Sequence, residues 1–478
     1  MADGWFNVYE PRSKHILPAV RMALFVPSLR SIECYFNPNA DRILREFHEL
    51  HRLAARMPAV QKLGLRFSVF ENWMHLNSNV GKIQLDGGAW RERLTGMLDQ
   101  FLNKGCKALS VAGGSTICSA FTANPFTKTA GFKFLFFKAL PRFWFVKPRK
   151  NKKITSTAYS NATIQPSTFP PQFRRKKQYF PSRTSVEPIP LEEFHLHSCI
   201  LLHPQFLDWT LSVFQKSWAI TILSLKSGMP PAALANLLSN ITLPVLSNFE
   251  ISCSLVIPRS SDSVDFLSIQ SFLTRHPSIT TLYLYGVLFP PRSVTLEKPI
   301  LPHLLSLTAH PNYVTWLLGP QDALPQLQQV TISSHYESCN VTFDHDLFDD
   351  AIRSVALITR EVTLSIRFAS QPLVEDWLHK HVAAGPRSVI TLLKRVRELK
   401  ICCFYHVDFS RDTLSVLSSF LALFPNLEHV HFTQQPGRLQ ERLLTEAFYE
   451  SVASQSPTIK TIQVNRLEPQ ELYSLKES

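Results

Sequence analysis

One short pattern recurs along this chain and limits what the chain can fold into. It consists of any residue, Pro, any residue, an apolar residue, two of any kind, then apolar, any and apolar. Recurrence of such a unit along a chain predicts a repeat protein. The seven copies are MPAVQKLGL from Met57, LPVLSNFEI from Leu243, HPSITTLYL from His276, LPHLLSLTA from Leu301, LPQLQQVTI from Leu324, FPNLEHVHF from Phe424 and SPTIKTIQV from Ser456. Copies without the proline begin at Cys106, Ile220 and Val396, and a degenerate one begins at Glu361.

Each copy predicts the end of a helix and the start of a strand. The alternating apolar residues at its end are typical of a half-buried strand, and the proline before them cannot continue a helix. We expect helices in between, for example over residues 39–57 and after Asp412 as a cap. The prolines at 244, 277, 302 and 325 stand 33, 25 and 23 residues apart. Those spacings are leucine-rich-repeat periods.

The fold class that follows is α/β, a leucine-rich-repeat solenoid with short parallel strands on the concave face and helices on the convex face. One strand and one helix cannot bury both of their apolar faces alone, so neighbouring repeats must stack. A doubly wound α/β domain also alternates strands and helices, but seven near-copies of one motif are not expected from it. We expect an N-terminal repeat segment over 1–120, an insert over 121–186 and the main array over 187–478.

The expected insert is strongly basic. It holds fourteen Lys or Arg and no Asp or Glu, while the whole chain has a net charge of +13, so the remainder is close to neutral. Because it is rich in Ser, Thr and Pro and fits no repeat, we expect a long loop or a disordered excursion. It could be a nuclear address, a patch for anionic surfaces, a solvated insert or intron sequence read through; the solvated insert is favoured. Its basic runs are Lys147, Arg149, Lys150, Lys152 and Lys153, and Arg174, Arg175, Lys176 and Lys177.

Motifs for catalysis and phosphate binding are missing. Gly113 and Gly114 are not followed by the Gly-Lys-Ser of a phosphate-binding loop, and a turn after a strand explains them more simply. A Gly-any-Ser-any-Gly nucleophile elbow is not found either. We therefore expect a non-enzymatic protein with no catalytic residues and no cofactor.

Two clusters have ligand types that metals use. His195, His197 and Cys199 would project from one face of a strand and could hold zinc, but a fourth ligand cannot be identified. Asp344, Asp346, Asp349 and Asp350 suggest calcium, but the glycine and terminal glutamate of a calcium-binding loop are lacking. We expect a solvated loop running into a helix cap there, and no metal site.

Residues that alternate with the buried apolar positions of the strands should form the binding surface. They mix polar and aromatic types without one sign of charge, which suits a protein partner of unknown identity better than nucleic acid. Tyr283 and Tyr285 are the expected energetic anchors, although any one of these residues could merely line a wet surface. The candidates are Tyr283, Tyr285, Thr308, His310, Thr331, Ser333, Lys400, His429, His431, Gln463 and Asn465.

The predicted function is therefore a protein-interaction scaffold that binds its partner on the concave strand face. The alternative is binding of nucleic acid or an anionic surface through the insert 121–186. A chain that used the insert in this way would lose binding, and the steep salt dependence of binding, when the insert is deleted.

The amino-acid sequences of several segments resemble those of the fungal, especially mushroom-type, F-box and leucine-rich-repeat proteins. In that family an F-box docks onto a ubiquitin-ligase adaptor while the repeats select a substrate, so the resemblance implies such an adaptor as a further partner. The first 30 residues show no F-box, so only the repeat half is carried over. The segments are LFVPSLRSIECYFNPNADRILREFHELHRLAARMP from Leu24, GAWRERLTGMLDQFLNKGCKALSVAGGS from Gly88, FLDWTLSVF from Phe206 and FLTRHPSITTLYLYG from Phe272, with residues from Leu301 onward.

The start of the chain and its cysteines indicate where the protein acts. Residues 1–12 are polar and acidic where a signal peptide would be basic and then apolar, and apolar stretches elsewhere are broken by charge. The eight cysteines have no framework spacing, which is typical of a reducing compartment. We expect no membrane association and a cytoplasmic or nuclear location.

Overall fold

The computed structural model describes most of the chain. Contacts divide the chain into two units, Met1–Thr122 with Pro188–Ser478, and Ala123–Glu187. The second unit, which includes both basic runs, lies outside the described residues. The described residues are 5–8, 29–36, 40–67, 86–114, 117–118, 121, 188–226, 231–253, 264–291, 294, 296, 298–319, 324–334, 344–368, 371–403, 411–434, 446–464 and 469–472.

The first unit alternates strands and helices. Its strands are β1 (Trp5–Val8), β2 (Ser31–Phe36), β3 (Lys62–Phe67), β4 (Ala108–Gly113), β5 (Glu193–His197), β6 (Ile222–Lys226), β7 (Asn248–Ser252), β8 (Thr281–Tyr285), β9 (Ser306–Ala309), β10 (Gln329–Ser333), β11 (Val362–Phe368), β12 (Val396–Cys403), β13 (His429–Gln434), β14 (Thr461–Val464) and β15 (Gln470–Glu471). Its α-helices are α2 (Ala40–Arg56), α3 (Gly87–Asn103), α5 (Pro204–Lys216), α6 (Pro231–Asn240), α7 (Phe266–Arg275), α8 (Pro311–Leu318), α9 (His345–Ala356), α10 (Gln371–Ala384), α11 (Arg411–Leu421) and α12 (Glu446–Gln455), with short 3₁₀ turns η5 (Ile200–Leu202), η6 (Gly385–Arg387) and η7 (Val389–Leu392).

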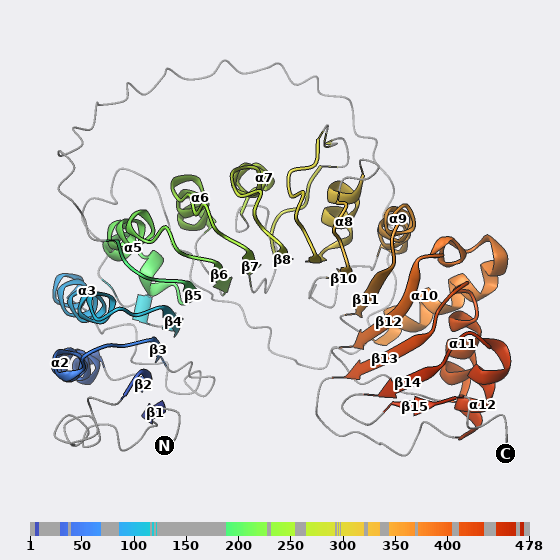
Figure 1. Ribbon diagram of the computed structural model, residues 1–478, viewed down its shortest axis with the longest axis horizontal. Helices are drawn as coiled ribbons and strands as arrows, with labels where there is room; N and C mark the ends of the chain where they lie inside the picture. The colour runs from blue at the N-terminus through green and yellow to red at the C-terminus, as the bar shows by residue number, and fades with distance from the viewer. Residues whose placement is uncertain are drawn as a thin grey trace, which may run out of the picture. The chain divides into compact units, whose positions relative to one another are not determined.

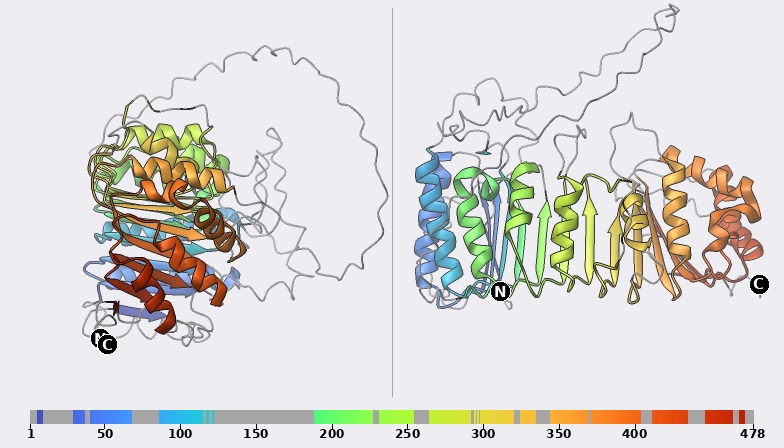
Figure 2. Two further views of the ribbon diagram at one scale, coloured as in Figure 1. Left: turned by 90° about the vertical axis from the view of Figure 1, so that its right-hand side faces the viewer. Right: turned by 90° about the horizontal axis from the view of Figure 1, so that it is seen from above.

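The fifteen described strands form one sheet in sequence order, and each strand from β1 to β13 pairs parallel with the next strand. The last described strand, β15, pairs antiparallel with β14. The described α-helices lie on one side of the sheet (Figure 1, Figure 2). A doubly wound domain needs helices on both sides and a point where the strand order reverses. That alternative is therefore wrong, and the architecture is a singly wound, solenoid-like α/β repeat with a parallel sheet.

The predicted strands are present at every copy of the motif. The seven proline copies run into β3, β7, β8, β9, β10, β13 and β14, and the four other copies run into β4, β6, β11 and β12. The helix expected over 39–57 is α2. The prediction that Asp412 caps the helix before residue 414 is wrong, because α11 already begins at Arg411 and includes Asp412.

One hydrogen-bond arrangement recurs where the chain enters successive strands. The N–H groups of Thr280 and Thr281 both donate to the carbonyl of Ser247, at 2.7 and 3.0 Å. The N–H groups of Leu305 and Ser306 donate in the same way to Thr280, at 2.7 and 3.0 Å. Each repeat thus fixes the start of the next strand through its backbone, which keeps the parallel register whatever the side chains are.

The core lies between the sheet and its helices and is continuous from Leu29, just before β2, to Leu472, just after β15. At its N-terminal end Phe47 packs edge-on against Trp90, with ring centroids 5.4 Å apart. Phe121, expected as the first residue of the insert, instead packs in this core, 5.6 Å from Trp90 and 5.7 Å from Phe206. Among the described helices, none is both long and apolar enough to cross a membrane.

The turn after β8 depends on Gly286. Its φ is +69°, and an added Cβ would lie 2.0 Å from the carbonyl oxygen of Cys253. We predict that Gly286→Ala destabilises the protein by about 1–3 kcal/mol, because both the left-handed conformation and the backbone clash oppose a side chain. Chemical denaturation followed by circular dichroism would measure the change.

Gly96, within α3, provides the matched control. An added Cβ there meets nothing within 4 Å. Gly96→Ala should therefore stabilise the protein by about 0.5–1 kcal/mol through helix propensity. Equal effects of the two substitutions would contradict the role assigned to Gly286.

Candidate functional site

The side of the sheet without described helices is the candidate site, and we call it the open face. In each strand the apolar residues point into the core, so the residues between them point to the open face. The strand register aligns one such residue from each of β4 to β14 into a row, which we call the middle row. It comprises Ser110, His195, Ser224, Glu250, Tyr283, Thr308, Thr331, Ser365, Lys400, His431 and Gln463.

Most of the predicted interface residues lie on this face. Tyr283, Thr308, Thr331, Lys400, His431 and Gln463 are members of the middle row. His429 stands two residues before His431 on the same strand, and Tyr285 and Ser333 stand two residues after middle-row members. The prediction therefore brought together residues from β8 to β14 that do share one surface.

Three of the predicted interface residues do not offer an accessible surface there. Thr331 and Ser333 are only 1% and 2% exposed. His310 is not on a strand, because β9 ends at Ala309. Its imidazole caps α8 by accepting from the N–H of Asn312 at 3.3 Å, and it stacks on Phe289 with centroids 3.9 Å apart. A fourth candidate, Asn465, lies outside the described residues.

Polar side chains of β5, β6 and β7 form a connected chain on the open face. His197 Nε2 lies 2.8 Å from Ser224 Oγ, and Ser224 Oγ donates to Glu250 Oε2 at 2.7 Å. The other carboxylate oxygen of Glu250 pairs with Lys226 Nζ at 2.8 Å. Because Ser224 donates its proton to Glu250, the connection requires His197 to donate through an Nε2–H. We call these four residues the β5–β7 polar chain.

The electrostatics of the polar chain favour a neutral histidine. Burial, with the charge of Lys226 as the next cause, lowers the pKa of His197 to about 4. A neutral imidazole can then donate to Ser224 at neutral pH. Beside it, burial raises the pKa of Tyr283, opposed by the charge of Arg367, which also hydrogen-bonds to it. Arg367 belongs to β11, so this contact reaches across β9 and β10.

The polar chain does not resemble an activated nucleophile. In a serine hydrolase a histidine stands between the serine and the carboxylate and removes the serine proton. Here the serine stands in the middle, its proton is directed at Glu250, and it is 2% exposed. The arrangement orders side chains on the sheet, which is a structural role.

Glu398 organises a second group, at β11 to β13. It accepts from Thr363 Oγ1 at 2.9 Å and pairs with Lys400 at 3.0 Å and His431 at 3.3 Å. Burial raises the pKa of Glu398, but the hydrogen bonds from Lys400 and Thr363 outweigh it, so the pKa is lowered. Two predicted interface residues, Lys400 and His431, are thus held in place by a carboxylate of the same face.

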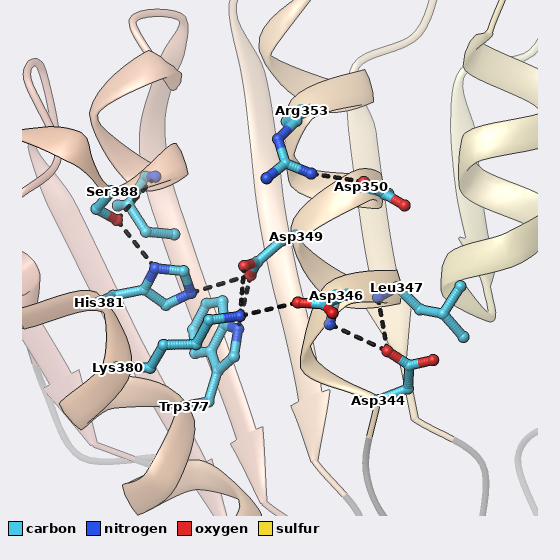
Figure 3. Close-up of polar contacts among 11 residues, drawn as sticks. Asp344, Asp346, Leu347, Asp349, Asp350, Arg353, Trp377, Lys380, His381 and Ser388 are labelled. Atoms are coloured by element: carbon cyan, nitrogen blue, oxygen red, sulfur yellow. Dashed lines mark hydrogen bonds and ion pairs between the residues drawn. The ribbon is translucent and has the colours of Figure 1, made fainter. Parts of the chain in front are cut away.

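A third polar cluster lies on the helix side, between α9 and α10 (Figure 3). His381 Nε2 lies 3.1 Å from Asp349 Oδ1, and His381 Nδ1 lies 3.0 Å from Ser388 Oγ. Lys380 Nζ donates to Asp349 Oδ2 at 2.8 Å, and Trp377 Nε1 donates to Asp349 Oδ1 at 3.3 Å. The order Ser–His–Asp is that of a catalytic triad.

Burial argues against catalysis in this cluster. Ser388 is 3% and His381 2% exposed, so neither side chain is presented to solvent. Ser388 Oγ is also engaged as the acceptor of the Ile390 N–H at 3.2 Å, where it caps η7. The cluster therefore fastens α9 and α10 to each other and to the turn that follows them.

The acidic residues before α9 were expected to be a solvated loop running into a helix cap. Asp344 does cap α9, accepting from the N–H groups of Asp346 and Leu347, both at 3.1 Å. Asp349 departs from the prediction because it is 5% exposed. Burial raises its pKa, but His381 and Lys380 outweigh that effect and hold the pKa of Asp349 at about 2.

The two metal-ligand clusters of the sequence do not come together as ligand sets. His195 and His197 lie on the open face with ring centroids 5.9 Å apart, whereas Cys199 lies beyond the strand against Cys118. Within the described ranges, no group of three or more His, Cys, Asp or Glu is placed to hold a metal ion.

Sequence reasoning missed Ser224, Glu250 and Arg367 as organisers of the open face. The alternation of each strand already assigns them to that face. Their contacts follow from which strands are neighbours and in what register, and only the structure gives this information.

Asp349 yields a test of these electrostatics. We predict that Asp349→Asn lowers the free energy of unfolding by about 2 kcal/mol at pH 7, because the carboxylate has a folded-state pKa of about 2 against an ordinary 3.8. This stabilisation is complete above the ordinary pKa and is lost as the pH falls through the folded-state pKa. The difference between the variant and the wild type should therefore shrink as urea unfolding is repeated from pH 5 towards pH 2.

Asp350→Asn is the matched control one residue along α9. Its side chain is 48% exposed and pairs with Arg353 on the surface. A surface pair of this kind contributes about 0–1 kcal/mol, so the control should change stability little. Equal losses for both variants, or a loss for Asp349→Asn that does not depend on pH, would contradict the assignment.

No protein-family model and no curated protein matches this chain.

Proposed function

We propose that this protein is a non-enzymatic scaffold that binds another protein on the open face of its sheet. One observation carries the proposal: the middle row continues over eleven strands without a described helix covering it. A solenoid grows by adding repeats, and the exposed side of its strands grows with them into an extended binding surface. An enzyme would need a few side chains gathered in a recess, which the row does not resemble.

The composition of the open face supports a protein partner. Tyr283 and Tyr285 stand two residues apart on β8, and tyrosines are enriched among residues that dominate binding energy. Charges of both signs occur side by side, as in the pairs Lys226–Glu250 and Lys400–Glu398. Nucleic acid would instead favour a positive face that follows the phosphates.

The internal contacts of the face have a consequence for binding. Glu250 and Glu398 hold Ser224, Lys400 and His431 in fixed positions before any partner arrives. Side chains that are already ordered lose less conformational entropy on binding. The open face is thus a preorganised surface.

Substrate recognition within a ubiquitin ligase is the specific form of this function that the resemblance to F-box and leucine-rich-repeat proteins suggests. The repeats would hold the substrate, and the ligase adaptor would be a second partner. A cytoplasmic or nuclear protein would meet both.

Binding of nucleic acid or an anionic surface through residues 121–186 is the second candidate. The charge of that segment favours it, since fourteen Lys or Arg are not balanced by any Asp or Glu. This second function predicts a different behaviour. The affinity for nucleic acid or the anionic surface should fall steeply as the salt concentration rises, and binding should be lost when residues 121–186 are removed.

The test is affinity capture from the source cells with quantitative mass spectrometry, using the full chain and the variant Tyr285→Ala. We predict that the true partner is captured about tenfold less by the variant, because truncating an aromatic anchor commonly costs over 1 kcal/mol of binding. Direct titration of that partner, once identified, against both purified chains would confirm the loss.

Leu267→Ala is the control from the same repeat but the opposite side. Leu267 belongs to α7 and is 69% exposed. If both variants capture the same proteins equally, the open face is not the binding surface. A chain lacking residues 123–187 separates the alternatives, because a scaffold keeps its partners and a nucleic-acid-binding protein loses its ligand. Recovery of adaptor and cullin subunits would specify the ligase form.

A further inference from the structure

Two cysteines lie together at the place where the chain leaves the repeat array and returns to it. The sulfur atoms of Cys118 and Cys199 are 2.8 Å apart, and both are free thiols. Cys118 comes just before the 123–187 unit, and Cys199 follows β5, the first strand after that unit. The pair therefore joins the two flanks of the unit.

The surrounding contacts hold both flanks in position. Strand β4 pairs directly with β5, for example Ala112 with His197. Ser198 Oγ donates to the carbonyl of Gly113 at 2.5 Å, and the N–H of Cys118 donates to the carbonyl of Gly114 at 3.0 Å. These bonds attach Cys118 itself, and Ser198 beside Cys199, to Gly113 and Gly114 at the end of β4. The two thiols meet because the backbone around them is fixed.

We propose that Cys118 and Cys199 form a reversible thiol-modification site, at which a small disulfide of the glutathione type converts the pair into a cross-link. A disulfide bond is about 2.05 Å long, so the sulfur atoms need to approach by about 0.8 Å. Cys118 is half-buried, which gives a small oxidant access, whereas Cys199 is 9% exposed. In a reducing compartment such cross-links are transient and respond to the redox state.

The chemistry balances without any other reactant. One thiolate attacks a sulfur of the small disulfide, a new S–S bond forms, and one thiolate of the reagent leaves. The second cysteine then attacks the first, its own S–S bond forms, and the second thiolate of the reagent leaves. The two protons from the cysteines end on the two released thiols. The cysteines are oxidised by two electrons, and the reagent is reduced by two.

Electrostatics favour the ionised form of Cys199 in the reduced pair. The Cys118 thiol beside it lowers the pKa of Cys199, and burial opposes the effect. Burial and the same hydrogen bond raise the pKa of Cys118. Burial also raises the pKa of Cys253 to about 11 and that of Cys106 to about 12. A thiolate is the reacting species, so Cys199 is distinguished from these buried cysteines.

The test uses the purified full chain in glutathione buffers that run from fully reduced to fully oxidised. After alkylation, peptides are mapped without reduction. We expect the peptide pair containing Cys118 and Cys199 to become the dominant cysteine product in the oxidised buffers and to disappear when a thiol reductant is added. Oxidation should also raise the thermal midpoint by several degrees, because the cross-link restricts the unfolded chain.

Three variants make the outcome decisive. Cys118→Ser should abolish the cross-link and its thermal shift. Cys199→Ser should also abolish both effects. Cys402→Ser, at a half-buried position on β12, should change neither. Circular dichroism of the reduced variants checks that each is folded.

A contrary result is equally clear. If Cys118 and Cys199 are recovered separately alkylated or separately bound to glutathione in every buffer while the wild type stays folded, the proposal is wrong. A thermal shift that persists in Cys118→Ser would also overturn it.

Discussion

The whole array depends on burying one ladder of apolar strand residues beneath the helices. The ladder passes through every strand from β2 to β14 in direct register, and each member is buried. A single strand and helix would leave most of this surface in water, so each repeat is stable only against its neighbours. The members are Ile32, Leu63, Leu109, Phe194, Leu223, Phe249, Leu282, Leu307, Val330, Leu364, Leu399, Val430 and Ile462.

The open face is a consequence of the same register. Successive side chains of a strand point to opposite sides, so any register that aligns the apolar ladder must also align the residues between its members. Slipping one strand by a residue would bury Glu250 or Lys400 and expose the neighbouring apolar side chain. Hydrophobic burial therefore sets the order of the polar row, and contacts such as Ser224–Glu250 only refine it.

Much of the fold could be predicted because the motif that marks each strand lies within nine consecutive residues. In HPSITTLYL the proline, the alternation and the apolar positions together define β8, and the same holds at each other copy. β2 was missed although VPSLRSIEC from Val26 fits the whole pattern, with Cys34 as its last apolar residue. β5 was missed because Leu191, Phe194 and Leu196 have the apolar spacing but Ile189 stands where the pattern has proline. His310 was misplaced for a related reason, since β9 ends one residue earlier than the alternation suggests and the following proline starts α8.

The candidate site was predicted less completely, because its contacts are not local. Residues on the open face followed from alternation, but accessibility did not, and Thr331 is buried although its position in the pattern equals that of Tyr283. Asp349 shows the same limit, because its burial depends on Lys380 and His381 of another helix.

The repeat array tolerates a long connection between two neighbouring strands, as the place of residues 123–187 in the sequence shows. β4 and β5 pair in full register although 79 residues separate Gly113 from Glu193, compared with 28 between β7 and β8. Because the entropy of closing a chain grows only with the logarithm of its length, the longer connection costs about 1 kcal/mol more. The strand pairing and the packing of Phe121 against Trp90 and Phe206 outweigh that cost. An array that stacks neighbour on neighbour can therefore carry a long addition between two repeats without changing the face that the repeats present.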